Sequence, residues 1–330
     1  MRALVTGGAG FIGSHLCEAL VARGDTVSVL DDLSTGRFEN IEHIPGIECV
    51  IDSTMNQEIV RDMVRAVDVV YHLGATVGVQ LVVNDPIHTI VNNIWGTEIV
   101  LEETCRYRRK LLITSTSEVY GKGSREVFHE DDDRVIGPTN RHRWCYAASK
   151  AIDEFLAFAY WREKRHPVVI ARLFNTVGPR QTGRYGMVIP TFVTQALRNE
   201  PLTVFGDGKQ SRCFTYVGDV VPALMQLMDR PEVNGNVYNI GSTMRVTIED
   251  LARRIIERTG SSSPIKFIPY EEVYGEGYED MRHREPCLKR IQAAIGYAPK
   301  TSLDEIIDSV IAYIRPRIQQ ESTRNRPANP

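Results

Sequence analysis

Tyr146 and Lys150 are the two residues of this chain whose types and spacing most clearly suggest chemistry. They lie four positions apart in the stretch CYAASK, so they share one face if that stretch is helical. A phenol has a pKa of about 10 and is a poor base at neutral pH, but a neighbouring ammonium favours the phenolate. The pair is therefore a candidate for taking a proton from a hydroxyl group, provided that other elements bring a substrate to it.

The elements that must position this pair are short apolar runs that alternate with helical patterns. Strands are expected at residues 2–6, 26–31, 47–51, 68–74, 110–115 and 168–173. Helices are expected between most of them, for example at 11–24, 87–106 and 144–164, and the last of these carries the Tyr/Lys pair. Apolar strands that alternate with helices predict an α/β fold, a doubly wound parallel sheet covered on both faces, over residues 1–175.

Three glycines at the end of the first expected strand predict a nucleotide site. Gly7, Gly10 and Gly13 have the spacing G-x-x-G-x-x-G, close to the G-x-G-x-x-G fingerprint of dinucleotide-binding folds. Such glycines permit a tight turn and a close backbone approach to a pyrophosphate. The next helix, which begins with Phe11 and Ile12, presents its N-terminus to the phosphates. The stretch is therefore expected to bind the pyrophosphate of a dinucleotide.

The choice between the two nicotinamide dinucleotides depends on the end of the second expected strand. Asp31 stands there, and its carboxylate can accept hydrogen bonds from the adenosine ribose hydroxyls and would repel a 2′-phosphate. Arg37 is the counter-evidence, because an arginine could pair with that phosphate. We therefore expect the cofactor to be NAD. A Rossmann domain at residues 1–175 is expected to bind it.

The composition of the 330 residues excludes several other classes of function. The net charge of −3 gives no general attraction to nucleic acid or to anionic membranes. The six cysteines contain no C-x-x-C pair and no zinc spacing with histidines, so no metal site is expected and the thiols are expected to be reduced. The chain has no apolar run of membrane-spanning length and no signal peptide at its start, and we expect a cytoplasmic protein.

The second half of the chain has a different pattern. Turn-rich stretches such as TVGPRQTGRYG and FGDGKQSR interrupt shorter helices and strands from residue 176 onward. Insertions after the later strands of such a sheet usually form a small lobe over the ligand crevice. We therefore expect a substrate-binding lobe mainly at 176–315, with some segments returning to the first domain. The polar, proline-bearing tail at 316–330 is expected to be disordered.

Six motifs occur in the order typical of one enzyme family: TGGAGFIG, YHLGA, NNIWGT, STSEVYG, YAASK and RLFNTVGP. The chain resembles the extended short-chain dehydrogenase/reductase family over all but its tail. The resemblance implies that Thr116, Tyr146 and Lys150 are catalytic, with Lys150 also holding the nicotinamide ribose. It further implies NAD contacts from Gly7, Gly10, Phe11, Ile12, Gly13, Asp31, Asp32, Asp52, Leu73, Ala75, Asn93, Ser115, Tyr146 and Lys150.

The second half resembles the nucleotide-sugar branch of that family. The stretch RLFNTVGPR is similar to the segment whose asparagine contacts the substrate diphosphate, which implies this role for Asn175. The stretch LTVFGDGKQSRCFTYVGD is similar to the uridine and phosphate cradle. This similarity implies that Arg212 binds the diphosphate and that Val204 and Phe205 lie near the base. The resemblance therefore implies a UDP-sugar substrate.

Residues 116–118 help to separate the reactions of this branch, all of which begin by oxidising C4 of the sugar. The triplet T-S-E resembles that of UDP-glucuronate decarboxylases, whereas dehydratases carry an aspartate in the middle. Glu118 is thereby implied to be catalytic and Ser117 to contact the substrate. The stretch YGEGYEDMRHREP also resembles these decarboxylases and implies that Arg284 is their active-site arginine. Arg284 and Arg184 are the candidates for binding a substrate carboxylate.

The implied reaction is decarboxylation of UDP-glucuronate to UDP-xylose. Oxidation at C4 gives a β-keto acid, which loses CO₂ readily, and Glu118, Ser117 or a water that they hold would return a proton to C5. The NADH formed then reduces C4, so the cofactor is regenerated and should be tightly bound. The alternatives are 4-epimerisation of UDP-glucuronate or another UDP-hexose, 4,6-dehydration, which Ser117 disfavours, and a non-catalytic NAD-sensing role, which Tyr146 and Lys150 disfavour.

Relatives in this branch dimerise through a four-helix bundle made of two helices from each copy. The corresponding helices of this chain are those expected at 87–106 and 144–164. The resemblance therefore implies a homodimer.

Overall fold

A seven-stranded sheet forms the centre of the protein in a computed structural model, which describes residues 1–78, 82, 84–123, 125–183, 186–274 and 281–324. The strand order is β12-β7-β5-β4-β1-β2-β3, and each strand runs parallel to its neighbours. The strands are β1 (Arg2–Thr6), β2 (Thr26–Leu30), β3 (Glu48–Val50), β4 (Val69–His72), β5 (Lys110–Thr116), β7 (Val168–Leu173) and β12 (Val237–Ile240). The predicted doubly wound parallel sheet is confirmed, and β12 is the strand that no apolar run had indicated.

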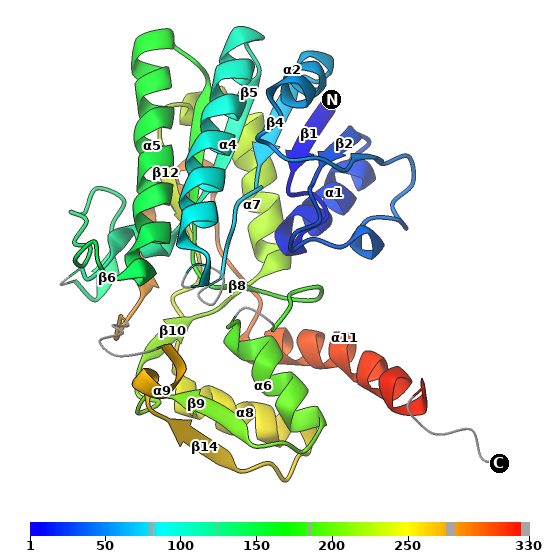
Figure 1. Cartoon of the computed structure of the whole chain (residues 1–330), viewed down its shortest axis with the longest axis vertical. Coiled ribbons are helices and arrows are strands. Elements are labelled where there is room, and N and C mark those ends of the chain that lie inside the picture. The colour runs from blue at the N-terminus through cyan, green and yellow to red at the C-terminus, as the bar shows by residue number, and fades with distance from the viewer. Residues whose placement is uncertain (79–81, 83, 124, 184–185, 275–280, 325–330) are drawn as a thin grey trace.

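Helices cover both faces of this sheet, as Figure 1 shows. On one face lie α1 (Phe11–Ala22), α7 (Val217–Asp229) and α10 (Lys289–Ile295), whose apolar residues share one core cluster with the sheet. On the other face lie α2 (Gln57–Ala66), α4 (Pro86–Arg106) and α5 (Cys145–Lys164), which close a second cluster. Burial on both faces explains why the strands read as unbroken apolar runs in the sequence.

The order of the strands reverses at β1. The chain moves outward from β1 to β2 and β3, and then returns to the other side of β1 with β4 and β5. At such a switch point the loops that follow the strands diverge and leave a crevice at the carboxyl edge of the sheet. The glycines after β1 and the T-S-E triplet at the end of β5 both lie at this edge.

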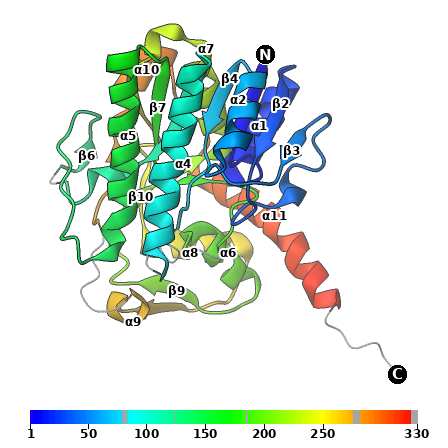
Figure 2. The ribbon, with the colours of Figure 1, turned by 45° about the horizontal axis from the view of Figure 1, so that its top comes forward.

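A smaller lobe lies beyond the carboxyl edge of the sheet, in the lower part of Figures 1 and 2. Its helices α6 (Val188–Leu197), α8 (Ile248–Thr259) and α11 (Leu303–Arg324) pack with strand β9 (Leu202–Phe205) around an apolar cluster of their own. Strand β14 (Ile265–Ile268) pairs with β9, and α9 (Tyr270–Tyr274) follows it. The elements α7, β12 and α10 return to the sheet, so the two parts interleave along the sequence.

Short elements surround the crevice. The paired short strands are β6 (Val127–Phe128) with β15 (Glu285–Pro286), β8 (Thr176–Val177) with β11 (Thr215–Tyr216), and β10 (Ser211–Cys213) with β13 (Arg245–Thr247). The 3₁₀ turns are η1 (Phe38–Asn40), η2 (Ser117–Tyr120), η3 (His142–Trp144) and η4 (Pro231–Val233). Two of these turns matter for the site, because η2 directly follows β5 and η3 directly precedes α5.

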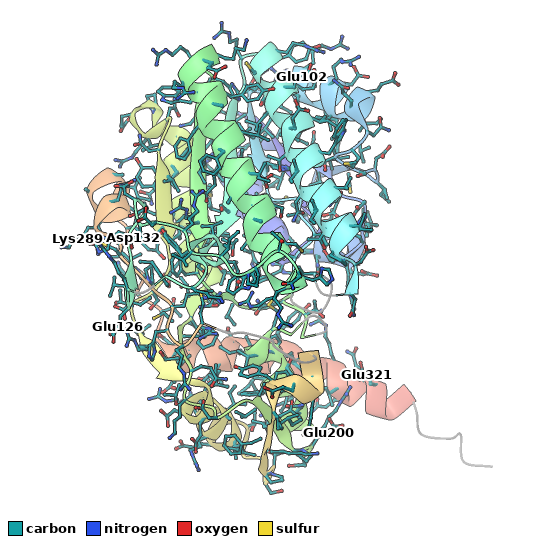
Figure 3. The ribbon with its side chains drawn as sticks, turned by 60° about the vertical axis from the view of Figure 1, so that its left-hand side comes forward. Glu102, Glu126, Asp132, Glu200, Lys289 and Glu321 are labelled. Atoms are coloured by element: carbon teal, nitrogen blue, oxygen red, sulfur yellow. The ribbon has the colours of Figure 1, made fainter. Side chains whose placement is uncertain are left out.

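Residues 316–324 form the end of helix α11, where the sequence predicted a disordered tail, so that prediction is wrong for them. Ile314 packs against the core of the lobe, and Arg198 forms an ion pair of 2.8 Å with Glu321, which Figure 3 shows on this helix. These contacts support a polar segment whose composition alone indicates no order. Residues 325–330 lie outside the described residues.

Two further features of the described residues concern the cysteine thiols and the character of the helices. All six cysteines lie in described segments, and each is a free thiol. None of the helices in these segments combines the length and the apolar character that crossing a bilayer requires.

Candidate active site

The glycine turn after β1 is packed so closely that larger residues do not fit. Gly7 has a φ of +69°, and a Cβ on it would lie 2.8 Å from the backbone nitrogen of Gly74. A Cβ on Gly13 would lie 2.1 Å from the carbonyl oxygen of Gly7. Helix α1 then begins with Gly10 at its N-cap, and no side chain caps its first amides. Close backbone and uncapped amides are the features that a dinucleotide pyrophosphate needs.

Asp31, just after β2, is only 7% exposed and ties the glycine turn to that strand. Its carboxylate accepts hydrogen bonds from the amides of Ala9 and Leu33, both at 2.9 Å. Burial raises the pKa of Asp31, and these two amides oppose the rise. Arg37, in contrast, is exposed on the loop that follows. This end of the site therefore fits the ribose of NAD better than the 2′-phosphate of NADP.

A cavity of about 570 Å³ lies between the carboxyl edge of the sheet and the lobe. Most of the residues that the sequence assigned to the site line it. They are Gly7, Gly10, Phe11, Ile12, Gly13, Asp31, Asp32, Asp52, Leu73, Ala75, Ser115, Thr116, Ser117, Glu118, Tyr146, Lys150, Asn175, Phe205, Arg212 and Arg284. The fold thus gathers into one cavity residues that are spread over most of the chain, whereas Arg37 is not part of its lining.

Two of the residues predicted to contact a ligand, Asn93 and Val204, lie outside the lining of this cavity. Asn93 on α4 is 1% exposed and bonds the amide of Thr76 and the hydroxyl of Ser149, so it fastens α5 to the loop after β4 instead of facing a ligand. Val204 is fully buried in the core of the lobe, because side chains alternate along a strand and Phe205 takes the cavity side of β9. Arg184 lies outside the described residues.

Substitution Gly13→Ala is expected to weaken NAD binding by about ten- to a hundredfold. The added methyl group must displace the backbone of the turn, and overpacking of this kind costs about 1–3 kcal/mol. Titration with NAD, followed by tryptophan fluorescence, measures the change. Gly46→Ala is the control: its φ of +69° also strains alanine, but a Cβ there meets no other atom and Gly46 does not line the cavity, so NAD affinity should be unchanged. Unchanged affinity in the Gly13 variant would show that the turn does not cradle the cofactor.

Tyr146, Lys150 and Thr116 come together at the cavity. Tyr146 lies in the first turn of α5 and Lys150 one turn later, while Thr116 ends β5 and hydrogen-bonds to the phenol. The protein's own groups raise the pKa of Tyr146, with burial as the main cause and the negative charge of Glu118 as the next. The sequence predicted a lowered pKa beside Lys150 and bound NAD⁺. The structure shows that Lys150 alone does not bring this about.

Glu118 lies between two arginines in the wall of the cavity. Its Oε2 is 2.7 Å from Arg143 and its Oε1 is 2.7 Å from Arg284. Arg284 also donates a hydrogen bond of 3.4 Å to the hydroxyl of Ser117. Burial by itself would raise the pKa of Glu118, but Arg284 and Arg143 lower it to about 2. Glu118 is therefore ionised at neutral pH, and two cations stand where a substrate carboxylate could bind.

Arg143 is a residue of this site that the sequence analysis missed. It is 8% exposed in η3, and its guanidinium stacks on Trp144 at 4.8 Å. One sequence feature could have identified Arg143: it stands three positions before Tyr146, about one helical turn from the catalytic phenol. Its pairing with Glu118 depends on the approach of η3 to η2, which no local pattern reveals.

The lobe side of the cavity carries the residues expected at a diphosphate. Asn175 donates a hydrogen bond of 3.1 Å to the carbonyl of Cys213, which ties it to the strand that carries Arg212. Arg212 is 9% exposed, and its charge contributes to the low pKa of Glu118. Tyr270 from α9 also lines this end and was not predicted. Arg212, Asn175 and Tyr270 therefore line the same cavity as the arginines beside Glu118.

Comparisons with known proteins agree with this geometry. A family model described as "NAD dependent epimerase/dehydratase family" matches residues 3–241. The UDP-N-acetyl-alpha-D-glucosaminuronate decarboxylase of Bacillus cytotoxicus is 40% identical over 95% of this chain and 98% of its own length. UDP-glucuronic acid decarboxylase 2 of Arabidopsis thaliana is 38% identical over 96% of this chain and 69% of its own length. The crystal structure of UDP-glucuronic acid 4-epimerase from Bacillus cereus, in complex with UDP-glucuronic acid and NAD, matches with a TM-score of 0.86 and 29% identity, over 96% of this chain and 100% of that one.

Proposed function

Because the chain belongs to the NAD dependent epimerase/dehydratase family, we propose that it decarboxylates a UDP-linked hexuronate through a 4-keto intermediate. The observation that carries this proposal is the ionic cluster of Glu118 with Arg143 and Arg284, in the same cavity as Tyr146. A cationic pocket beside the groups that oxidise C4 suits a sugar with a carboxylate on C5. Relatives that match at least 95% of the chain are named as decarboxylases of such sugars.

Tyr146 would start the reaction by taking the proton of the 4-hydroxyl group, while Thr116 holds the same oxygen by a hydrogen bond. When bound beside Tyr146, NAD⁺ would supply an acceptor for the hydride of C4 and, once reduced, a donor for its return. Lys150 lies one helical turn from Tyr146, where its ammonium can hold the ribose of the cofactor. The glycine cradle and Asp31 would retain the rest of the cofactor, so that one molecule serves many turnovers.

The oxidised sugar is a β-keto acid, because only C5 separates the C4 ketone from the carboxyl carbon. Arg284, which pairs with Glu118 in the free protein, would pair with the substrate carboxylate instead, while Arg143 would keep Glu118 ionised. The bond from C5 to the carboxyl carbon breaks, CO₂ leaves, and its electron pair forms an enolate that Thr116 and the protonated Tyr146 stabilise at the C4 oxygen. A water held by Glu118 would then protonate C5, a proton from solvent would neutralise the hydroxide left behind, and reduction of C4 would give the UDP-pentose.

UDP-glucuronate is our first choice of substrate, with UDP-xylose as the product. The 40% identical relative is named for the 2-acetamido sugar and the 38% identical one for glucuronic acid, so the two candidate substrates differ at C2. Arg212 and Asn175 line the cavity and would hold the diphosphate that both substrates share.

Incubation of the protein with NAD⁺ and three different sugars tests the proposal. UDP-glucuronate and UDP-N-acetylglucosaminuronate are the candidate substrates, and UDP-glucose, which lacks the carboxylate, is the control. Mass spectrometry is expected to show that one of the uronates becomes lighter by one CO₂. Turnover of UDP-glucose with neither uronate converted would contradict the proposal.

4-Epimerisation is the second candidate function, favoured by the similarity to the Bacillus cereus UDP-glucuronic acid 4-epimerase. The same oxidation at C4 would be followed by rotation of the keto sugar and reduction of its other face. Loss of CO₂ requires the bond to the carboxyl group to stand roughly perpendicular to the C4 carbonyl plane, and a carboxylate held in that plane is retained. A product of unchanged mass with inverted C4 would assign this reaction instead.

We also propose that the protein is a homodimer formed through α4 and α5. These helices pack against each other, and Figure 3 looks onto the face that they form, with Glu102 near the end of α4. Large apolar side chains are exposed on them: Ile87 (76%) and Trp95 (59%) on α4, and Phe155 (66%) on α5. Two such helices from each copy would make a four-helix bundle and remove this apolar face from water.

Substitution of Trp95 or Phe155 by glutamate is expected to weaken the dimer by about 2 kcal/mol or more, roughly thirtyfold in the dissociation constant, because buried aromatic residues dominate interfaces. Light scattering after size-exclusion chromatography, at several concentrations, measures the change. Phe267→Glu is the control, since Phe267 is 47% exposed on β14 of the lobe. A wild-type protein that is monomeric throughout would rule the dimer out.

A further inference from the structure

Asp153 is a buried carboxylate that the reaction described above does not use. It lies on α5 one turn after Lys150, and its Oδ2 is 2.8 Å from the ammonium nitrogen of Lys150. The exposed fractions of the two side chains are 0% and 3%. Burying two charges costs free energy of desolvation, which an ion pair on a solvated helix surface does not incur. A buried pair that includes the catalytic lysine therefore needs an explanation.

A histidine on β4 and a threonine on α4 lie beside the pair. His72 on β4 faces Lys150, and burial together with that positive charge lowers the pKa of His72 to about 3, so the imidazole is neutral at physiological pH. Its Nε2 is 3.1 Å from the hydroxyl of Thr97 on α4. The neighbouring elements therefore contribute neutral hydrogen-bonding groups on this side of Lys150.

The other acidic groups near Tyr146 have cationic partners of their own. Glu118 on η2 is paired with Arg143 and Arg284. Glu154, next to Asp153 on α5, is paired with Arg172 at 2.7 Å. Asp153 is thus the carboxylate paired with the catalytic lysine. Burial raises the pKa of Asp153, while the charge of Lys150 and hydrogen bonds from Lys150 and Thr97 oppose that rise and favour the carboxylate.

This opposition acts against the phenolate of Tyr146. A lone ammonium one turn away would stabilise the phenolate, but a carboxylate at 2.8 Å from that ammonium offsets most of its field. Asp153 is among the groups that raise the pKa of Tyr146, after burial and Glu118. Ribose hydroxyls that accept hydrogen bonds from Lys150 carry no charge. When Lys150 bonds to them as well as to Asp153, its positive charge lowers the pKa of the phenol more effectively.

We propose that Asp153 is a positioning residue that holds the Lys150 ammonium until the cofactor ribose competes for it, so that deprotonation of Tyr146 depends on a bound cofactor. The inference rests on the function proposed for the same site. It adds that the first proton transfer depends on the bound cofactor. Without the dinucleotide, the buried pair keeps Tyr146 a neutral phenol. With the dinucleotide in place, the ammonium is shared and proton abstraction from the sugar becomes favourable.

Substitution Asp153→Asn tests this role. It removes the negative charge and nearly preserves the shape, so the acid limb of the pH profile of kcat should move to lower pH by about one unit. The ultraviolet absorbance of phenolate, taken as the difference between each protein and its Tyr146→Phe counterpart, reports the ionisation of Tyr146 without any turnover. We expect the wild-type ionisation to differ between NAD-bound and NAD-free protein, and this difference to shrink in the Asp153→Asn variant.

Glu103→Gln is the matched control. Glu103 is also 0% exposed and pairs with an arginine three positions along a helix, Arg106 on α4 at 3.0 Å, although Arg106 itself is 42% exposed. Its substitution should lower stability without moving the ionisation of Tyr146. Asp153→Ser is a second variant, in which a water can replace the carboxylate beside Lys150.

Unchanged ionisation of Tyr146 in both Asp153 variants would overturn the proposal, and so would failure of both to fold, since the pair would then serve folding. The absorbance titration uses no sugar substrate. A wrong assignment of the decarboxylation would therefore leave its result intact, and the two failures are distinguishable.

Discussion

Replacement of Tyr146 by phenylalanine is expected to lower kcat by about 10²- to 10⁴-fold, the range that a positioned acid–base group contributes. The change removes only the hydroxyl, which is hydrogen-bonded to Thr116 at the end of β5. Without it, nothing at that position takes the proton of the 4-hydroxyl group, so oxidation at C4 stops. Binding of NAD and of the UDP-sugar, measured by calorimetry, should be preserved because the ring remains.

Tyr160→Phe is the control for this variant. Tyr160 lies on the same helix α5, and its ring packs edge-on against His166, away from the residues that line the cavity. The control should keep wild-type kcat. Full activity in the Tyr146 variant would remove the proton-transfer role from this residue and with it the starting step of every reaction considered for the site.

Replacement of Arg284 by glutamine is expected to lower kcat/KM for a UDP-hexuronate by about thirtyfold or more. Truncation of one partner of a buried charge pair costs about 2–5 kcal/mol, and here it removes the cation that would take over the substrate carboxylate. The pKa of Glu118 should also rise, because the positive charge of Arg284 is a main cause of its low value. Inhibition by UDP, which lacks the carboxylate, should change little.

Arg282→Gln is the matched control, two positions away on the same segment. Arg282 is 70% exposed and pairs with Asp207 at the surface, so its loss should leave kcat/KM near the wild-type value. If UDP inhibition weakened as much as uronate turnover in the Arg284 variant, Arg284 would serve the diphosphate or the fold and not the carboxylate.

The architecture of this protein is readable from its sequence because local patterns carry it. The apolar runs at 2–6 and 168–173 become β1 and β7, with the same bounds. The glycine spacing indicates a close contact between position 13 and the carbonyl of Gly7, where a side chain at position 13 would clash. Tyr146 and Lys150 are readable for the same reason, since one helix alone sets their relation.

What the sequence does not reveal depends on contacts between distant segments. Arg143 meets Glu118 only because η3 lies against η2. Asn93 donates a hydrogen bond to Ser149 because α4 packs on α5. Residues 316–324 are helical because of contacts such as the ion pair between Arg198 and Glu321. The raised pKa of Tyr146 has a similar origin, because burial and a carboxylate from another segment outweigh the nearby lysine.

Decarboxylation is tested most directly by following the carboxyl carbon itself. UDP-glucuronate labelled with ¹³C in its carboxyl group, incubated with the protein and NAD⁺ in deuterated water, should release labelled CO₂. The UDP-pentose that remains should carry one deuterium on C5, where the solvent-derived proton enters. Retention of the label in a UDP-hexuronate with inverted C4 would contradict decarboxylation and assign the epimerase reaction.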